Sequence, residues 1–192
     1  MATRDRILAA ARKAFERHGL DGLSLRDVAA KVGITPMAIY RHFESKEALV
    51  DALVLDALEE WSACVAALPP AEGIEKVEQM GAAFLDFALH EPRRFEAAFL
   101  LPSRKARRYP DDFAAGRSPG GNVQLKALEQ AIRAGKVAGA PPIEIMLINS
   151  ALSQGLITLY RAGRIAGGED EFRALYHRAM RRVFQSFVVE KS

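Results

Sequence analysis

The sequence predicts an all-α protein, and three observations support that fold class. Apolar residues recur three and four positions apart along most of the chain, which is the period of an amphipathic helix. Ser or Thr precedes several of these stretches and Gly follows them, as is typical of helix starts and ends. No stretch alternates apolar and polar residues in the manner of a half-buried strand. We therefore expect about nine helices and no internal repeat.

The 192-residue chain is long enough for one or two domains with a sizeable core, and its 49% hydrophobic content is typical of globular proteins. The single cysteine, Cys64, excludes an internal disulfide framework and most multi-cysteine metal sites. The charged N-terminus does not resemble a signal peptide, and no stretch approaches the ~18 uninterrupted apolar residues of a membrane span. We expect a cytoplasmic protein with no membrane association, no cofactor and no metal.

All of the excess positive charge lies in the first quarter of the chain. Residues 1–50 contain nine Lys/Arg and six Asp/Glu, a net charge of +3, whereas the remaining residues contain 18 of each and are neutral. A basic segment on a neutral body favours a polyanion as partner. A solvated helix surface would carry the same charge, so charge alone leaves both interpretations open.

The first two helices are expected close to the N-terminus. Thr3 is in position to cap the first of them, and Gly19 is in position to end it. Ser24 and Asp27 match a capping box at the start of the second helix, in which each side chain accepts a hydrogen bond from a free backbone N–H. Gly33 is expected to end this second helix.

A third, short helix is expected directly afterwards. Thr35 would cap it, and Pro36 would occupy its first position, where a missing N–H costs nothing. Because Gly33 tolerates positive φ and Ile34 can fill the gap between two helices, residues 24–43 have the pattern of a helix-turn-helix. In such motifs the second helix enters the major groove of DNA. The side chains that this helix is expected to expose are Thr35, Pro36, Met37, Tyr40, Arg41 and His42.

The remainder of the chain predicts further helices separated by Pro- and Gly-rich stretches. Ser45 is expected to cap a fourth helix that continues to Pro69. The stretch 104–121 predicts a long loop, and 135–142 predicts a linker. The other helices are expected over residues 74–90, 92–101, 122–133, 143–162 and 169–189.

The residues around the helix-turn-helix also match the pattern of a known family. The matching stretches are Val28-Ala29, Val32-Gly33-Ile34, Ile39-Tyr40-Arg41-His42-Phe43 and Ser45-Lys46-Glu47-Ala48-Leu49, at the family's spacing and without insertion. They closely resemble the DNA-binding domain of TetR family (tetracycline-repressor-like) regulators. The resemblance implies a helix-turn-helix DNA-binding domain in residues 1–47 and a helical ligand-binding and dimerisation domain in residues 48–192.

The resemblance implies a set of ten residues that contact DNA. Ser24 and Arg26 resemble contacts from the second helix to phosphate and to a base. Tyr40, His42 and Lys46 resemble phosphate contacts. The residues that stand where family members read the groove are Thr35, Pro36, Met37, Ala38 and Arg41. The family often has polar side chains or glycine at positions 36–38, so we expect apolar contact and the Arg41 guanidinium to contribute more here than base hydrogen bonds.

The resemblance also implies a homodimer formed through the last two helices of each subunit. A palindromic operator requires two reading heads, which favours that interpretation. Apolar residues of the last helix share one side at coiled-coil-like spacing, although packing inside one subunit is the alternative. These residues are Phe172, Tyr176, Ala179, Met180, Val183 and Phe187.

The C-terminal region gives weaker indications of a ligand. Stretches 90–95 and 154–164 resemble the WHG subtype of C-terminal domain, which has Trp-His-Gly where this chain has Ser153-Gln154-Gly155. Residues that could line an effector cavity, with core packing as the alternative for each, are Met80, Phe84, Phe87, Phe95, Phe99, Met146, Asn149 and Tyr160. The aromatic content favours an apolar or aromatic ligand, whereas the basic stretch 104–108 favours an anionic one or is simply solvated.

Together these features predict a ligand-responsive repressor that binds a palindromic operator as a dimer and is released by a small-molecule effector. An enzyme is the first alternative, but the chain has no phosphate loop, dinucleotide fingerprint or nucleophile elbow. Its four histidines are scattered without paired metal spacing. A helical protein-interaction module is the second alternative.

Overall fold

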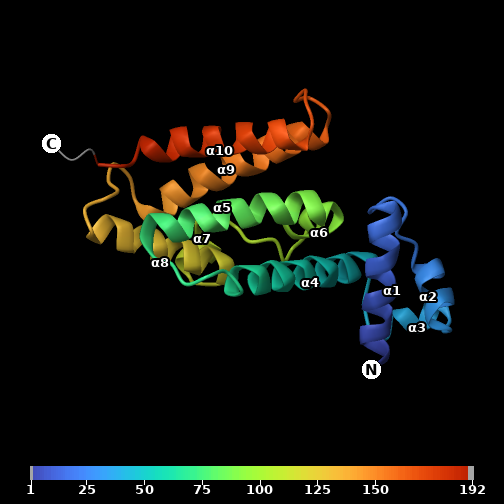
Figure 1. Ribbon diagram of the computed structural model, residues 1–192. Coiled ribbons are helices and arrows are strands. Elements are labelled where there is room, and N and C mark those ends of the chain that lie inside the picture. Colours follow the sequence, from blue (N-terminus) through green and yellow to red (C-terminus); the bar gives the residue numbers. More distant parts are fainter. Residues whose placement is uncertain (1, 190–192) are drawn as a thin grey trace. The chain divides into compact units, whose positions relative to one another are not determined.

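A computed structural model describes residues 2–189, and within them the chain forms ten α-helices and no β-strand (Figure 1). The predicted all-α fold class is therefore confirmed. The helices are α1 (Thr3–His18), α2 (Leu25–Val32), α3 (Pro36–Ile39), α4 (Lys46–Ala66), α5 (Gly73–His90), α6 (Pro92–Phe99), α7 (Asp111–Ala114), α8 (Pro119–Arg133), α9 (Pro142–Arg161) and α10 (Glu169–Gln185).

The helices belong to two compact units. Unit 1 comprises the chain up to Trp61 together with His90–Ala106, and unit 2 comprises Ser62–Leu89 together with the chain from Arg107 onward. The boundary thus falls inside α4, and α6 belongs with α1–α3. A functional division after residue 47 remains a prediction.

The core of unit 1 is formed by the inner sides of its short helices. Ile7 and Phe15 of α1, Val28 of α2 and Ile39 of α3 are almost completely buried, each contributing on the order of 2 kcal/mol by leaving water. At the edge of this core, the Arg4 guanidinium lies 4.9 Å from the centroid of the buried Phe43 ring.

Three of the predicted helix caps are confirmed. Ser24 Oγ accepts from the Asp27 N–H at 3.3 Å, Thr35 Oγ1 from the Ala38 N–H at 3.2 Å, and Ser45 Oγ from the Ala48 N–H at 3.1 Å. These bonds satisfy N–H groups that have no partner inside the helix.

The predicted Thr3 cap is wrong by one position. Thr3 is the first helical residue of α1, and Ala2 is the N-cap. The carboxylate of Asp5 accepts from the Ala2 N–H at 3.2 Å, so an acid inside the first turn satisfies the backbone at this helix start.

Several predicted boundaries differ from the structure, and the last helix, for example, ends at Gln185 rather than at residue 189. The fourth helix ends at Ala66 rather than at Pro69, because two consecutive prolines restrict the residue before them and lack N–H donors. The predicted loop 104–121 contains the short helix α7, and α8 begins inside it at Pro119, with Ser118 Oγ accepting from the Gly121 N–H.

Unit 2 has its own apolar core where α5, α8, α9 and α10 meet. Its buried members are Val77, Ala127, Leu128, Ala131, Val137, Ile145, Met146 and Phe184. Near the other end of α9, the Tyr160 ring stacks on that of Phe172 at a centroid distance of 4.0 Å. These contacts hold α9 and α10 side by side, as Figure 1 shows.

α9 differs from its neighbours in composition and burial. In the part of the chain that the structure describes, it is the one helix long and apolar enough to cross a membrane by length and composition. Only 28% of its apolar stretch is buried within the protein.

Candidate nucleic-acid interface

The turn between α2 and α3 depends on Gly33. This residue has φ 76° and ψ 37°, in the left-handed region, and its N–H donates to carbonyls of the preceding turn. A Cβ placed on Gly33 would meet no atom within 4 Å, so the backbone angle rather than space makes glycine necessary. Directly after it, the Ile34 N–H donates to the Ala29 carbonyl at 3.0 Å, which closes the second helix. The predicted sharp turn is confirmed.

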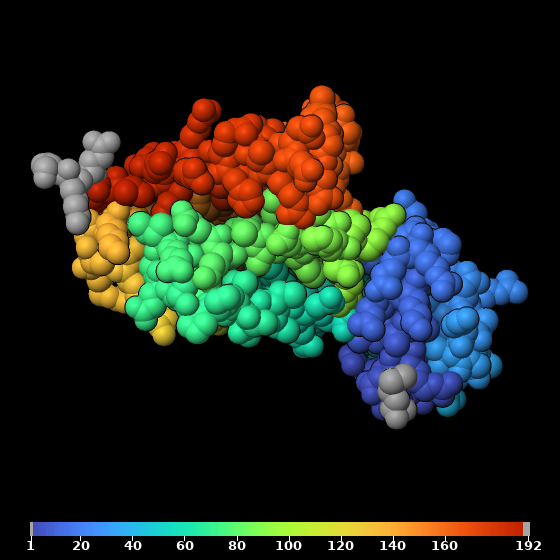
Figure 2. Space-filling view, in the orientation of Figure 1, coloured from blue at the N-terminus to red at the C-terminus, as the bar shows by residue number. Residues whose placement is uncertain are grey.

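α3 is attached to unit 1 by one side and exposes the other. Its inward residue, Ile39, is fully buried, and Phe43 follows it into the core. On the outer side Met37 is 72% exposed and Tyr40 is 48% exposed, which is unusual for large apolar or aromatic side chains. In the space-filling view the α2–α3 segment lies at the surface of unit 1 (Figure 2).

The structure places all ten predicted DNA-contact residues on or beside this surface segment. Those that are exposed are Arg26, Thr35, Pro36, Met37, Tyr40, Arg41 and His42. Ser24, Ala38 and Lys46 are half-buried, and Ser24 and Thr35 also use their hydroxyl oxygens as caps. The exposed guanidinium, imidazole and hydroxyl groups near the apolar Met37 side chain suit both phosphate oxygens and base edges. The role of each residue at DNA remains a prediction.

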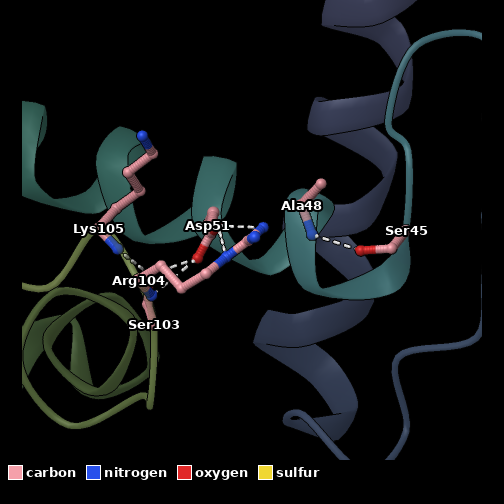
Figure 3. Close-up of polar contacts among 6 residues, drawn as sticks. All are labelled: Ser45, Ala48, Asp51, Ser103, Arg104 and Lys105. Carbon is pink, nitrogen blue, oxygen red and sulfur yellow. Dashed lines mark hydrogen bonds and ion pairs between the residues drawn. The ribbon is translucent and has the colours of Figure 1, made fainter.

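A buried carboxylate that the sequence analysis missed ties the 103–105 segment to α4 (Figure 3). Asp51 is 7% exposed, and its oxygens accept from the Ser103 hydroxyl at 2.7 Å and from the Arg104 backbone and guanidinium at 3.2 Å. Burial alone raises the pKa of Asp51, but the hydrogen bonds from Ser103 and Arg104 outweigh it and hold the pKa below its ordinary value. The carboxylate therefore stays ionised. It holds residues 103–105 against α4 at a position six residues after Ser45.

A second charged cluster joins α1, α4 and α6 inside unit 1. Arg94 is 4% exposed and pairs with Asp56 at 2.8 Å and with Glu60. Arg12 of α1 also approaches Asp56, at 3.6 Å. Among the described residues, Asp56 Oδ2 accepts no hydrogen bond, and the two guanidinium groups balance its charge. The only sequence signal for this cluster is an arginine within the otherwise apolar buried side of α6.

The eight predicted effector residues are divided between the two units. Phe95 and Phe99 belong to unit 1, where their rings lie 5.2 Å apart and the Trp61 ring lies 6.0 Å from Phe99. The other six belong to unit 2, where Met146 is part of the apolar core and Tyr160 stacks on Phe172. The six are Met80, Phe84, Phe87, Met146, Asn149 and Tyr160. A shared role as effector contacts remains a prediction.

The apolar side predicted for the last helix packs largely within the subunit. Phe172 and Tyr176 are fully buried, and the Tyr176 hydroxyl donates to the Gly81 carbonyl of α5 at 3.0 Å. These two residues therefore cannot face a partner subunit. The large apolar side chains that α9 exposes are Leu147, Ile148 and Leu159.

Two family models match the chain. Residues 7–53 match the model described as bacterial regulatory proteins, tetR family, and residues 77–183 match the model described as tetracyclin repressor-like, C-terminal domain. The second match alone spans more than half of the chain. Whether the C-terminal region is of the WHG subtype stays a prediction.

Known proteins resemble the chain in sequence and in fold. The HTH-type transcriptional regulator UidR of Escherichia coli K12 is 40% identical over 78 residues, which cover 41% of this chain and 39% of UidR. The matched part of this chain thus spans about two fifths of that relative's length.

Many solved structures resemble the whole chain, and two of them serve as examples. A protein of unknown function from Rhodococcus sp. RHA1 has a TM-score of 0.78 at 22% identity over 98% of this chain and 97% of its own. A bacterial regulatory protein in the tetR family, also from Rhodococcus RHA1, has a TM-score of 0.67 at 19% identity over 100% of both chains. At these identities the two structures show a shared fold. The two family models, which match both the helix-turn-helix and the helices that follow it, show that the chain belongs to the tetR family of bacterial regulatory proteins.

Proposed function

We propose that this protein is a transcription repressor that binds a palindromic DNA operator as a homodimer and is released by a small-molecule effector. The observation that carries the proposal is the surface of α3, which has one buried residue, Ile39, and directs Met37 and Tyr40 into solvent. A helix that is packed on one side and exposes such side chains on the other, next to Arg41 and His42, is what a major groove can accommodate.

The homodimer is proposed to form through α9 and α10, with α9 supplying most of the apolar contact. Ile148, Ala151, Gly155 and Leu159 follow one another at steps of three or four residues and are all exposed, so they share one helix face. Gly155 has no atom within 4 Å of an ideal Cβ, which leaves room for a partner helix to approach closely. Packing this face against its copy in a second subunit would remove it from water.

Release by an effector is proposed to work through negative linkage between the two units. The effector would bind unit 2 and favour an arrangement in which the two α3 helices no longer fit successive major grooves, about 34–36 Å apart. Linkage requires that operator DNA weaken effector binding by the same factor. A compound that stabilises unit 2 yet leaves operator affinity unchanged would contradict this mechanism.

The proposal places the protein in the cytoplasm, where the operator is, and assigns it no catalytic step. An enzyme would turn over a substrate with DNA absent, and a protein-interaction module would bind its partner with little dependence on salt. DNA binding that weakens steeply as salt rises separates the repressor from both.

The experiment that tests the proposal is selection of bound sequences from random duplex DNA by the full-length protein. We expect enrichment of a palindrome whose half-site centres lie about one helical turn, or a multiple of it, apart. Enrichment of a non-palindromic sequence would contradict the proposal that the protein binds DNA as a symmetric dimer. No enrichment over input would remove the repressor function itself.

A further inference from the structure

We propose that Asn149 of α9 is the polar anchor of a binding site in unit 2 for an uncharged ligand that carries both a hydrogen-bond donor and an acceptor, such as a carboxamide or lactam. The inference rests on the proposed function to the extent that this ligand would be the effector. Its physical basis is confined to α5, α9 and α10.

Asn149 is buried but not hydrogen-bonded. Its side chain lies on the inner side of α9 and the residue is 3% exposed, yet neither Oδ1 nor Nδ2 has a hydrogen-bond partner in the structure. A carboxamide offers two N–H donors and a carbonyl oxygen, and nearly all buried groups of this kind in proteins are paired. An amide that the fold leaves unpaired is available to something that the fold does not contain.

The contrast with the next polar residue on the same side of α9 is direct. Ser153, one turn further along, lies 2.6 Å from the Tyr176 hydroxyl, and that hydroxyl donates to the Gly81 carbonyl at 3.0 Å. Since the tyrosine has one proton to give, Ser153 must donate to Tyr176. The fold therefore uses Ser153 and Tyr176 to join α9, α10 and α5, and it leaves Asn149 unused.

Gly81 of α5 is half-buried and puts no side chain beside the Tyr176 hydroxyl. A Cβ placed on Gly81, whose carbonyl receives the Tyr176 bond, would meet no atom within 4 Å. A small side chain at this point of α5 would therefore fit without displacing a neighbour.

The chemistry of the surroundings indicates an uncharged ligand. Among the described residues of unit 2, Asn149 and Ser153 are the buried polar side chains, and neither carries a charge. Burial raises the pKa of Tyr176 to about 12, so this hydroxyl is also neutral at physiological pH. The other buried residues on this side of α9 are Ile145, Met146 and Ile157. A charged ligand would lose its hydration without gaining a counter-ion, whereas a neutral amide could form two hydrogen bonds with Asn149 and rest its apolar part on these residues.

The test uses the full-length protein without DNA and three probes of nearly the same shape. Benzamide is neutral with a donor and an acceptor, acetophenone is neutral with an acceptor only, and benzoate is an anion. We expect benzamide to bind with a Kd of about 1 mM or tighter, at least about tenfold more tightly than either analogue. In ¹⁵N spectra, the side-chain NH₂ signals of Asn149 should shift with benzamide and saturate at the same Kd.

Two variants separate a ligand role from a structural one. Asn149→Leu replaces an unpaired amide with an apolar side chain of similar size, so we expect an equal or higher Tm together with loss of the benzamide preference. Asn122→Leu is the control, because the Asn122 amide donates to the Gly116 carbonyl at the surface, and it should keep the preference.

Three outcomes would overturn the inference: no benzamide binding by the wild type at that concentration, an unchanged preference in Asn149→Leu, or a lower Tm in that variant, which would show that the fold needs the amide. None of these measurements involves DNA. A failure here with a palindrome recovered in the selection would remove only the ligand site, and the reverse result would remove only the repressor function.

Discussion

The Ser103 hydroxyl donates a hydrogen bond to the Asp51 carboxylate at 2.7 Å, across 52 positions of sequence (Figure 3). The next residue, Arg104, adds a backbone N–H at 3.2 Å and its guanidinium to the same carboxylate. Ala106 is the last residue of this part of unit 1. Residues 103 and 104, just before it, are therefore attached to α4. This contact holds the segment that follows α6 against the N-terminal part of α4.

Replacing Asp51 by Asn should destabilise the protein by about 1–3 kcal/mol, because the buried group loses its charge-assisted bonds to Ser103 and Arg104. The pKa of Asp51 is lowered in the folded state, so its contribution to stability is complete above the ordinary carboxyl pKa of 3.8 and is lost as pH falls further. The difference in unfolding free energy between wild type and Asp51→Asn, measured with urea, should thus shrink as pH falls below about 4. Asp21→Asn, at an exposed acid of the same unit, should not destabilise the protein.

For Tyr176 we predict the opposite dependence of protein stability on pH. Burial raises its pKa from 10.0 to about 12, against the effect of the Ser153 bond. The unfolded chain therefore releases this proton first, and stability that is complete below about pH 10 declines as pH rises toward about 12. In Tyr176→Phe this part of the alkaline decline should be absent, while Tyr109→Phe, at an exposed tyrosine, should retain it. An identical alkaline profile for wild type and Tyr176→Phe would contradict the buried neutral hydroxyl.

Gly33→Ala should destabilise the protein by about 1–2 kcal/mol and weaken DNA binding as well. The reason is backbone strain at φ 76°, since the added methyl group would meet no atom. Gly81→Ala is the matched control, because Gly81 lies inside α5 at helical angles with equally open space, and there alanine should stabilise by about 0.5–1 kcal/mol. Thermal unfolding of the two variants should give shifts of opposite sign, and equal shifts would show that the turn does not depend on the glycine.

A charge on the exposed face of α9 should dissociate the proposed homodimer. Ile148 is 41% exposed, and in Ile148→Lys two lysines would be brought into the apolar contact between subunits. Sedimentation should find this variant as a monomer at concentrations where the wild type is a dimer. Leu100→Lys is the control, since Leu100 is equally exposed, at 40%, but belongs to unit 1. If both variants dissociated, or if neither did, the result would contradict a homodimer interface formed specifically by α9.

The features that sequence predicts well in this protein are local. The caps of Ser24, Thr35 and Ser45 each bind an N–H three residues away, so the residues that decide them are neighbours in the sequence. The turn at Gly33 likewise depends on one backbone angle. For this reason the helix-turn-helix was predictable in position and in detail.

The features that sequence did not reveal depend on distant residues. Nothing around Asp51 identifies Ser103 and Arg104 as its partners, because the pairing exists only after α6 has returned to α4. The pattern of Phe172 and Tyr176 correctly indicated a buried helix face, but periodicity does not say whether the cover comes from the same subunit or another. The unpaired state of Asn149 is also a property of the packed fold, since its sequence neighbours are ordinary for a core helix.

The most direct test of the central claim is the salt dependence of operator affinity for wild type, Lys46→Ala and Lys126→Ala, on the palindrome recovered by selection. Lys46 stands at the first residue of α4, and Lys126 is an exposed lysine of α8 in unit 2. The account predicts that Lys46→Ala weakens binding to all sequences alike and makes the slope of log K against log salt shallower by about 0.9, the value of one phosphate contact, while Lys126→Ala changes neither quantity. Equal slopes for all three proteins, or an affinity that does not fall with salt, would contradict it.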